Sequence, residues 1–216
     1  ANLVLAEAYY MQQNFQAAYM QLISLRAWLS MEPDYLLLLG KVMNARHMYA
    51  DALQTLLTAK DAGKTGSDLF MHLGIASYET QAFKDAKEYY RLSLYRDDSN
   101  AAAWIGLART EYELDHLDES LEAWMRASAL SPDDPEISLG IAMIHIRTKH
   151  FGEAVSVLKK LKEKGSPPPR TMYYLGHSYM RLGQRDEARR SFEMFLEMWQ
   201  GDEELAAEVR DILVTL

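Results

Sequence analysis

The chain has 216 residues, of which 49% are hydrophobic and 25% charged, a balance that supports a folded core and excludes a disordered chain. The 23 Lys and Arg residues against 31 Asp and Glu residues give a formal net charge of −8, which argues against binding to nucleic acid or to an anionic membrane surface. The absence of cysteine excludes disulfides and Cys-based zinc sites, and no apolar run reaches the roughly 18 residues of a membrane-spanning helix, so we expect no direct membrane insertion.

A 34-residue period runs along the chain as far as about residue 201. A small residue recurs at this interval, each time preceded by Leu or Ile: Ala6, Gly40, Gly74, Ala108, Ala142 and Gly176. Twelve residues later a second column contains Ala in every copy except Ser120, and four residues further on each copy has a large apolar residue. Small residues at fixed places let two helices approach closely, and the large residues fill the space between pairs. Each repeat is therefore predicted to be a helical hairpin.

Helix breakers and caps fall at matching points of the period. Three prolines share one position, seven residues before a small residue, where a first-turn proline loses no helical hydrogen bond: Pro33, Pro135 and Pro169. Asn14, Asp118 and Asp186 are predicted to cap the second helices of their repeats. Gly152 and Gly183 are predicted to mark the turn between the two helices of a repeat.

The two ends of the chain differ in pattern. Residues 202–216 carry Leu205, Val209 and Ile212 at helical spacing, which predicts a final helix that covers the last repeat and turns its acidic residues to water. We therefore divide the chain into six repeats over residues 1–201 and a capping helix over residues 202–216. Ala1 falls inside the predicted first helix, so we expect either a natural protein that extends further towards the N-terminus or a first helix that ends bluntly, because stacked repeats need a polar cap.

The pattern resembles the tetratricopeptide repeat, whose 34-residue unit has a small residue in its first helix and an alanine in its second. The last repeat is the nearest match, with Leu175, Gly176, Tyr179, Ala188 and Phe192. The resemblance implies an all-α, right-handed superhelix, or α-solenoid, of six helix-turn-helix units plus a C-terminal capping helix. It also has departures, since Ser77, Glu111 and His145 occupy a column that is usually aromatic.

The resemblance further implies a concave groove lined by the first helix of each repeat. In this chain the groove positions combine tyrosines and apolar residues with a few basic ones, a composition typical of protein-binding surfaces. The predicted protein-binding groove consists of Tyr10, Lys41, Asn44, His72, Ile75, Tyr78, Arg109, Tyr112, Met143, Ile146, Tyr173, Tyr174 and His177. Gly106 and Gly140 remove side chains from its middle, so we expect a ligand to approach the backbone there.

A second surface is predicted on the outer face. Tyr89, Leu92 and Tyr95 lie on the predicted second helix of their repeat, where the position of Leu92 is Arg126 one repeat later. They form either a patch for self-association or a second partner, or ordinary scattered surface aromatics.

The sequence contains no signature of an enzyme or of a cofactor site. The 6 histidines never fall at the close pair spacing of a helical zinc site, and no phosphate-binding loop or nucleophile elbow occurs. We expect no catalytic residue, no metal ligand and no cofactor.

The main hypothesis is a non-catalytic scaffold or adaptor that holds an extended or helical segment of another protein in its concave groove. Chaperone-binding relatives clamp a C-terminal carboxylate with Lys, Asn and Arg on successive repeats, and that clamp is missing here. Two alternatives stay open: a structural subunit that self-associates into a homo-oligomer or larger complex, and a secretion or pilus assembly chaperone of the bacterial envelope. The compartment is not determined, with the cytoplasm preferred to the periplasm.

Overall fold

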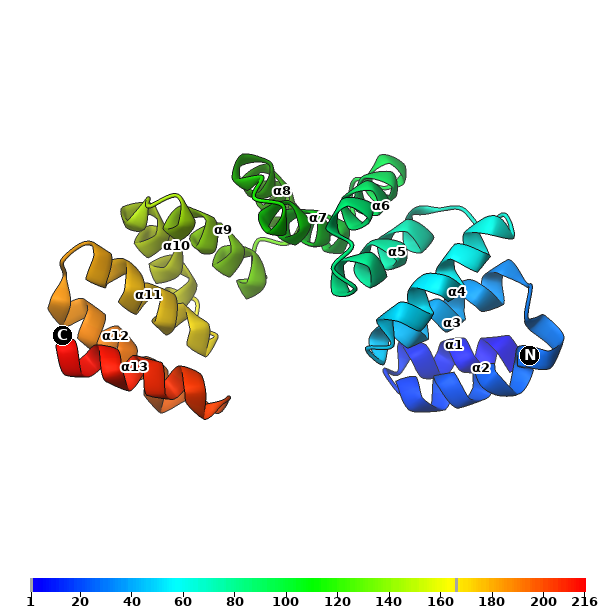
Figure 1. Cartoon of the computed structure of the whole chain (residues 1–216), viewed down its shortest axis with the longest axis horizontal. Coiled ribbons are helices and arrows are strands. Elements are labelled where there is room, and N and C mark those ends of the chain that lie inside the picture. The colour runs from blue at the N-terminus through cyan, green and yellow to red at the C-terminus, as the bar shows by residue number, and fades with distance from the viewer. Residues whose placement is uncertain (1, 166) are drawn as a thin grey trace. The chain divides into compact units, whose positions relative to one another are not determined.

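The computed structural model describes residues 2–165 and 167–216, and Ala1, which the sequence places in the first helix, lies outside these ranges. All regular elements within them are α-helices, labelled α1 to α13 (Figure 1). Their contacts divide the chain into an N-terminal part, Ala1–Ser120, and a C-terminal part, Leu121–Leu216, which we describe separately.

The helices alternate between the first and the second helix of a repeat. The first helices are α1 (Asn2–Met11), α3 (Pro33–Ala45), α5 (Ser67–Glu79), α7 (Ala101–Glu113), α9 (Pro135–Arg147) and α11 (Pro169–Arg181). The second helices are α2 (Phe15–Leu29), α4 (Tyr49–Asp61), α6 (Phe83–Arg96), α8 (Leu117–Leu130), α10 (Phe151–Glu163) and α12 (Arg185–Met198), and α13 (Glu203–Thr215) follows. This order confirms the predicted all-α fold of helix-turn-helix repeats and agrees with six repeats and one further helix.

The small residues of the 34-residue period lie where a large side chain crosses a first helix. A Cβ atom added to Gly40 would lie 2.4 Å from Cγ of Leu56, and one added to Gly176 would lie 2.6 Å from Cε1 of Phe192. Both distances are far inside van der Waals contact. The large residue of each second helix therefore packs directly on the backbone of its own first helix, as the two columns predict.

The predicted helix starts are mostly confirmed. Pro33, Pro135 and Pro169 are each the first residue of a helix. Asn14 caps α2 by accepting a hydrogen bond of 3.1 Å from the Ala17 N–H. The caps predicted at Asp118 and Asp186 are wrong, because both are the second residue of their helices, where a carboxylate still interacts favourably with the helix dipole.

The turn between the two helices of a repeat uses one residue in the left-handed region in every copy. These residues are also 34 apart: Gln13, His47, Gln81, Asp115, Lys149 and Gly183, with φ between 59° and 75°. The turn leaves the backbone hydrogen-bonded, as where the Met48 N–H donates to the Met43 carbonyl at 2.9 Å. Gly152, predicted to lie in this turn, is instead the second residue of α10.

Each part has its own buried core. In the N-terminal part the core includes Leu22, Tyr35, Leu56 and Leu73. In the C-terminal part Phe192 and Phe195 of α12 are fully buried, and so is Val209 of α13. Helix α13 thus covers α12 with an apolar face, as its spacing predicts.

Candidate protein-binding surfaces

A connected polar cluster lies on the first helices of the N-terminal part. Lys41 Nζ of α3 lies 2.8 Å from Asp68 Oδ2 of α5 and 5.2 Å from the centre of the Tyr10 ring. His72, one helical turn after Asp68, places Nε2 3.4 Å from Oδ1 of the same carboxylate. Hydrogen bonds from His72 and then from Lys41 hold the pKa of Asp68 well below its usual range. Asp68 is not among the residues predicted from the sequence, although its i, i+4 spacing to His72 indicates the contact.

Two of the predicted groove residues are buried between α3 and α5. Asn44 and His72 are each only 6% exposed, and Asn44 Nδ2 donates a hydrogen bond of 2.9 Å to the His72 backbone carbonyl. This corrects the expectation that both side chains face a ligand. Their polar groups hold neighbouring repeats together instead.

The tyrosines four residues after the small column have a structural contact. Tyr10 lies 5.7 Å, centre to centre, from Phe15, and Tyr78 lies 5.5 Å from Phe83, so each packs on the first residue of the next helix. Burial raises the pKa of both tyrosines. The other predicted groove residues of this part have accessible surface: Ile75 and Tyr112 are half-buried, and Arg109 is exposed.

The C-terminal part contains a pocket of about 640 Å³, which we call the C-terminal pocket. It is lined by Ile146, Arg147, Lys149, Phe151, Tyr173, Tyr174, His177 and Arg181. Four of these were predicted groove residues, whereas the predicted Met143 is half-buried outside the lining. Sequence reasoning missed Arg147 and Arg181, although they share one repeat position, five residues after a small residue.

The pocket combines aromatic surface with positive charge. The Tyr173 ring lies 4.4 Å from the His177 ring and 5.5 Å from the Tyr174 ring, centre to centre. Its hydroxyl donates to Glu208 of α13 at 3.3 Å, and burial together with that carboxylate raises the pKa of Tyr173 to about 12. Among the described lining residues three are basic and none is acidic. The pocket therefore suits a ligand with both an anionic and an apolar group.

His177 is the histidine that lines this pocket. Its ring lies 5.1 Å from the Phe192 ring, and its Nε2 atom is buried without a hydrogen-bond partner among the described residues. Burial lowers the pKa of His177, so the ring is neutral at neutral pH.

The expectation that Gly106 and Gly140 open the backbone to a ligand is wrong. A Cβ atom at Gly106 would lie 2.3 Å from Cζ of Tyr90, and one at Gly140 would lie 2.3 Å from Cε2 of Trp124. Aromatic rings of the preceding second helices occupy the space that the glycines leave.

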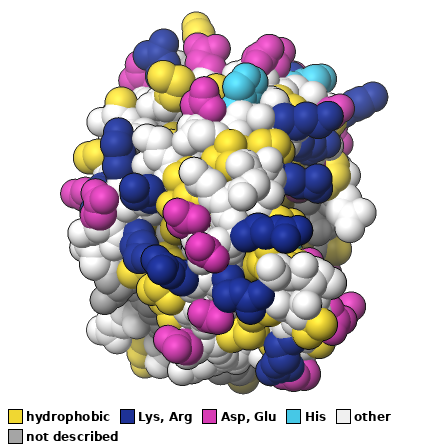
Figure 2. All heavy atoms as spheres, turned by 90° about the vertical axis from the view of Figure 1, so that its left-hand side faces the viewer, with side chains coloured by type: hydrophobic (Ala, Val, Ile, Leu, Met, Phe, Trp, Pro, Cys, Tyr) yellow, Lys and Arg dark blue, Asp and Glu magenta, His cyan; other side chains and the backbone are white. Residues whose placement is uncertain are grey.

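The three predicted outer-face residues differ in exposure. Tyr95 is 87% exposed and Leu92 39% exposed. Tyr89 is half-buried, because it stacks on Phe70 at 6.5 Å and lies under the Lys60 ammonium at 5.8 Å. The face of the C-terminal part turned to the viewer in Figure 2, by contrast, mixes basic, acidic and hydrophobic side chains.

Within the described ranges, no group of three or more His, Asp or Glu side chains is placed to hold a metal ion. No helix in the same ranges has the length and apolar character needed to cross a membrane.

Comparison with known proteins decides the family. Tetratricopeptide repeat models match residues 71–135, 105–168 and 170–208. The chain belongs to the tetratricopeptide repeat family. Proteins with these repeats generally act in protein–protein interactions and are typically not catalysts.

Two relatives share a low sequence identity with this chain. The TPR repeat-containing protein YpiA of Bacillus subtilis (strain 168) is 23% identical over 168 residues, which is 76% of this chain and 38% of YpiA. Human cilia- and flagella-associated protein 70 is 26% identical over 173 residues, which is 75% of this chain and 15% of that protein. The chain thus matches much less than two thirds of either relative.

Solved structures share the fold over most of the chain. PilF of Pseudomonas aeruginosa has a TM-score of 0.78 at 14% identity and covers 98% of this chain and 96% of its own. A tetratricopeptide repeat protein from Parabacteroides merdae has a TM-score of 0.70 at 15% identity, and the match covers 99% of this chain and 83% of that protein's chain. MamA of AMB-1 has a TM-score of 0.67 at 21% identity, and the match covers 82% of this chain and 98% of the MamA chain. At these identities the likeness shows the fold alone.

Proposed function

We propose that this chain is a non-catalytic scaffold that holds a segment of another protein against its first helices, with the C-terminal pocket as the anchor. The proposal rests on one observation: an aromatic and basic pocket is lined largely by first-helix side chains of two successive repeats. Tyrosine and arginine are among the residues that most often carry binding energy at protein interfaces.

The charges indicate the kind of segment. In a chain with a formal net charge of −8, a pocket lined by Arg147, Lys149 and Arg181 favours an acidic partner. Tyr174 and Phe151 add apolar surface beside these cations. An extended or helical segment with an acidic side chain next to an aromatic or aliphatic side chain fits both the cations and the apolar surface of the pocket.

A peptide-display selection tests this proposal. Random 12-residue peptides are selected on the full chain, and the enriched peptides are measured by fluorescence anisotropy against wild type and a Tyr174→Ala, Arg181→Glu variant. We expect acidic peptides with aromatic or aliphatic residues to be enriched and their affinity to fall at least about tenfold in the variant, since reversing a charge that faces a bound carboxylate costs more than about 1.4 kcal/mol.

The matched control is Arg190→Glu, an exposed arginine on α12 of the same repeat, which should leave the affinity unchanged. Equal affinity for wild type and the pocket variant, with both folded by circular dichroism, rejects the C-terminal pocket as the anchor. Failure to enrich any peptide rejects the scaffold proposal for segments of this length.

A self-associating subunit is the second candidate, favoured by apolar exposure on the first hairpin. Trp28 is 83% exposed, Met11 75%, Val4 66% and Met20 59%. Exposed apolar surface of this kind marks interaction sites when it is contiguous. Light scattering over a concentration series separates the two candidates, because self-association predicts a rising mass that Trp28→Glu reduces, whereas a constant monomer mass excludes it. An assembly role in the bacterial envelope has only the fold shared with PilF in its favour.

A further inference from the structure

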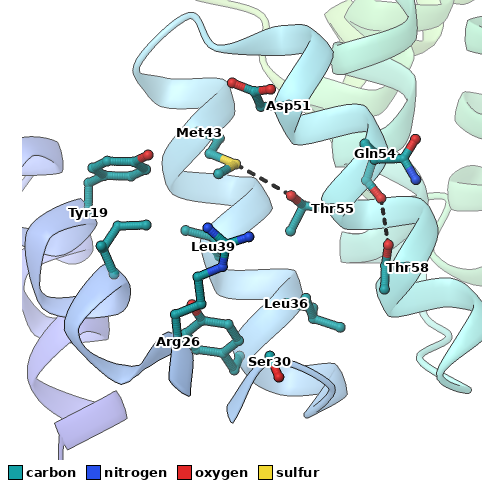
Figure 3. Close-up of a pocket in the computed structure, with 12 residues that line it drawn as sticks. Tyr19, Arg26, Ser30, Leu36, Leu39, Met43, Asp51, Gln54, Thr55 and Thr58 are labelled. Carbon is teal, nitrogen blue, oxygen red and sulfur yellow. Dashed lines mark hydrogen bonds between the residues drawn. The ribbon is translucent and has the colours of Figure 1, made fainter. Parts of the chain in front are cut away.

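A second depression lies on the second-helix side of the N-terminal part. It has a volume of about 440 Å³ and runs between α2 and α4, with α3 as its floor (Figure 3). We call it the outer trough. Leu36, Leu39 and Met43 of α3 form its apolar floor.

The outer trough is elongated along the helices. The wall on this side consists of Tyr19, Ile23 and Arg26 of α2 and of Ser30, the residue that follows α2, a stripe at spacings of four, three and four residues. At 1.5 Å per residue, this stripe extends about 16 Å, or three turns. A depression of this length between two helices matches the stripe of side chains on one face of a third helix.

The repeat period explains why this space is open. Thr55 and Leu36 line the outer trough, and the residues 34 positions later are Tyr89 and Phe70. There the two aromatic rings stack at 6.5 Å and fill the corresponding space between α4 and α6. In the outer trough the Thr55 hydroxyl instead donates to Met43 Sδ at 3.6 Å, which leaves the volume above it empty.

Two opposite charges lie along the outer trough. Arg26 projects from α2 and Asp51 from the first turn of α4, and neither forms a salt bridge within the part of the chain that the structure describes. By the 34-residue period, Asp51 corresponds to position 17 of α2, nine residues before Arg26, so the two backbone positions are about 13 Å apart along the helix axis.

We propose that the outer trough docks one amphipathic helix of a partner protein, which carries an acidic and a basic residue about two turns apart with apolar residues between them. The acidic residue pairs with Arg26 and the basic residue with Asp51, while the apolar residues cover Leu36, Leu39 and Met43. This site is independent of the C-terminal pocket.

Three 16-residue helical peptides serve as probes. They share two leucines on one face and differ in the charged pair, seven residues apart: Glu and Lys, Glu and Glu, or Lys and Lys. Because the Glu and Lys peptide matches both charges of the outer trough, we expect it to bind wild type about fivefold more tightly than either like-charge peptide. This ratio of affinities corresponds to the contribution of one surface ion pair. Asp51→Lys should transfer this preference to the Glu and Glu peptide.

Thr55→Tyr tests the volume, because it introduces the residue that the next repeat carries at the same position. We expect it to reduce binding of the Glu and Lys peptide at least about tenfold; Leu36→Phe is the second filling variant if Thr55→Tyr lowers the melting temperature. Asp85→Lys, at the position of Asp51 one repeat later, is the matched control and should change nothing. Equal binding of the three peptides by wild type, or unchanged binding by folded filling variants, overturns the proposal.

Discussion

At the scale of single residues, the glycines show how far a repeat pattern can mislead about a ligand. Gly140 was expected to leave the backbone open, yet Trp124 of the preceding helix lies over it. The absence of a side chain serves packing, because a large ring needs the volume that a Cβ atom would take.

Gly140→Ala should therefore destabilise the protein. Its Cβ would lie 2.3 Å from Trp124 Cε2, and overpacking of this kind costs about 1–3 kcal/mol. Gly152→Ala is the matched control, since nothing lies within 4 Å of its Cβ position and a helical alanine gains up to about 1 kcal/mol over glycine. Urea denaturation measures both, and equal effects of the two substitutions would refute the packing role.

His177 predicts a pH dependence of stability. Because burial depresses its folded-state pKa, the unfolded chain binds the proton more readily, and stability falls as the pH drops below the ordinary histidine value of 6.5. Wild type should lose more stability between pH 7.5 and pH 5.5 than His177→Gln. Thermal unfolding at the two pH values checks this, and an equal or larger loss in the variant would contradict it.

The burial of Glu111 could not be predicted from the repeat pattern. It occupies a column that is usually aromatic, yet it is only 1% exposed. Lys87 Nζ at 2.9 Å and Arg91 Nη2 at 3.7 Å compensate its charge, and His116 Nδ1 lies 2.8 Å from the same side chain. The spacing of the columns carries no information on such compensation, because Lys87 belongs to the preceding repeat.

At the scale of elements, the helix limits follow closely from the sequence. Prolines, the small column and the apolar spacing fix where each helix begins and which face it buries. The caps predicted at Asp118 and Asp186 lie within two positions of the true caps, because acidic residues are favoured both at the cap and in the first turn of a helix.

Helix α13 offers a direct test of its covering role. Val209 is fully buried and Val214 is 86% exposed in the same helix. Val209→Ala should cost about 1–3 kcal/mol of unfolding free energy, whereas Val214→Ala should stay within about 0.5 kcal/mol. Chemical denaturation of both variants measures this, and similar losses would show that α13 does not cover the core.

At the scale of the whole molecule, the 34-residue period was enough to predict the all-α repeat fold, since every copy repeats the same packing. The candidate site could be predicted only in part. Tyr173, Tyr174, His177 and Ile146 come together in one pocket, but Asn44 and His72 are buried. The 34-residue period predicts on which side of its helix a residue lies. Whether that residue is exposed depends also on the size of the side chains in the neighbouring repeats, as Thr55 and Tyr89 show.

The central claim is that the C-terminal pocket binds an acidic partner segment. Nuclear magnetic resonance of the isotope-labelled chain during titration with a selected acidic peptide tests it most directly. The account predicts that the largest shift changes occur at Ile146, Tyr174 and Arg181 and that binding weakens as salt is added. Largest changes on the outer side of α12, or none in the C-terminal part at saturating peptide, would contradict it.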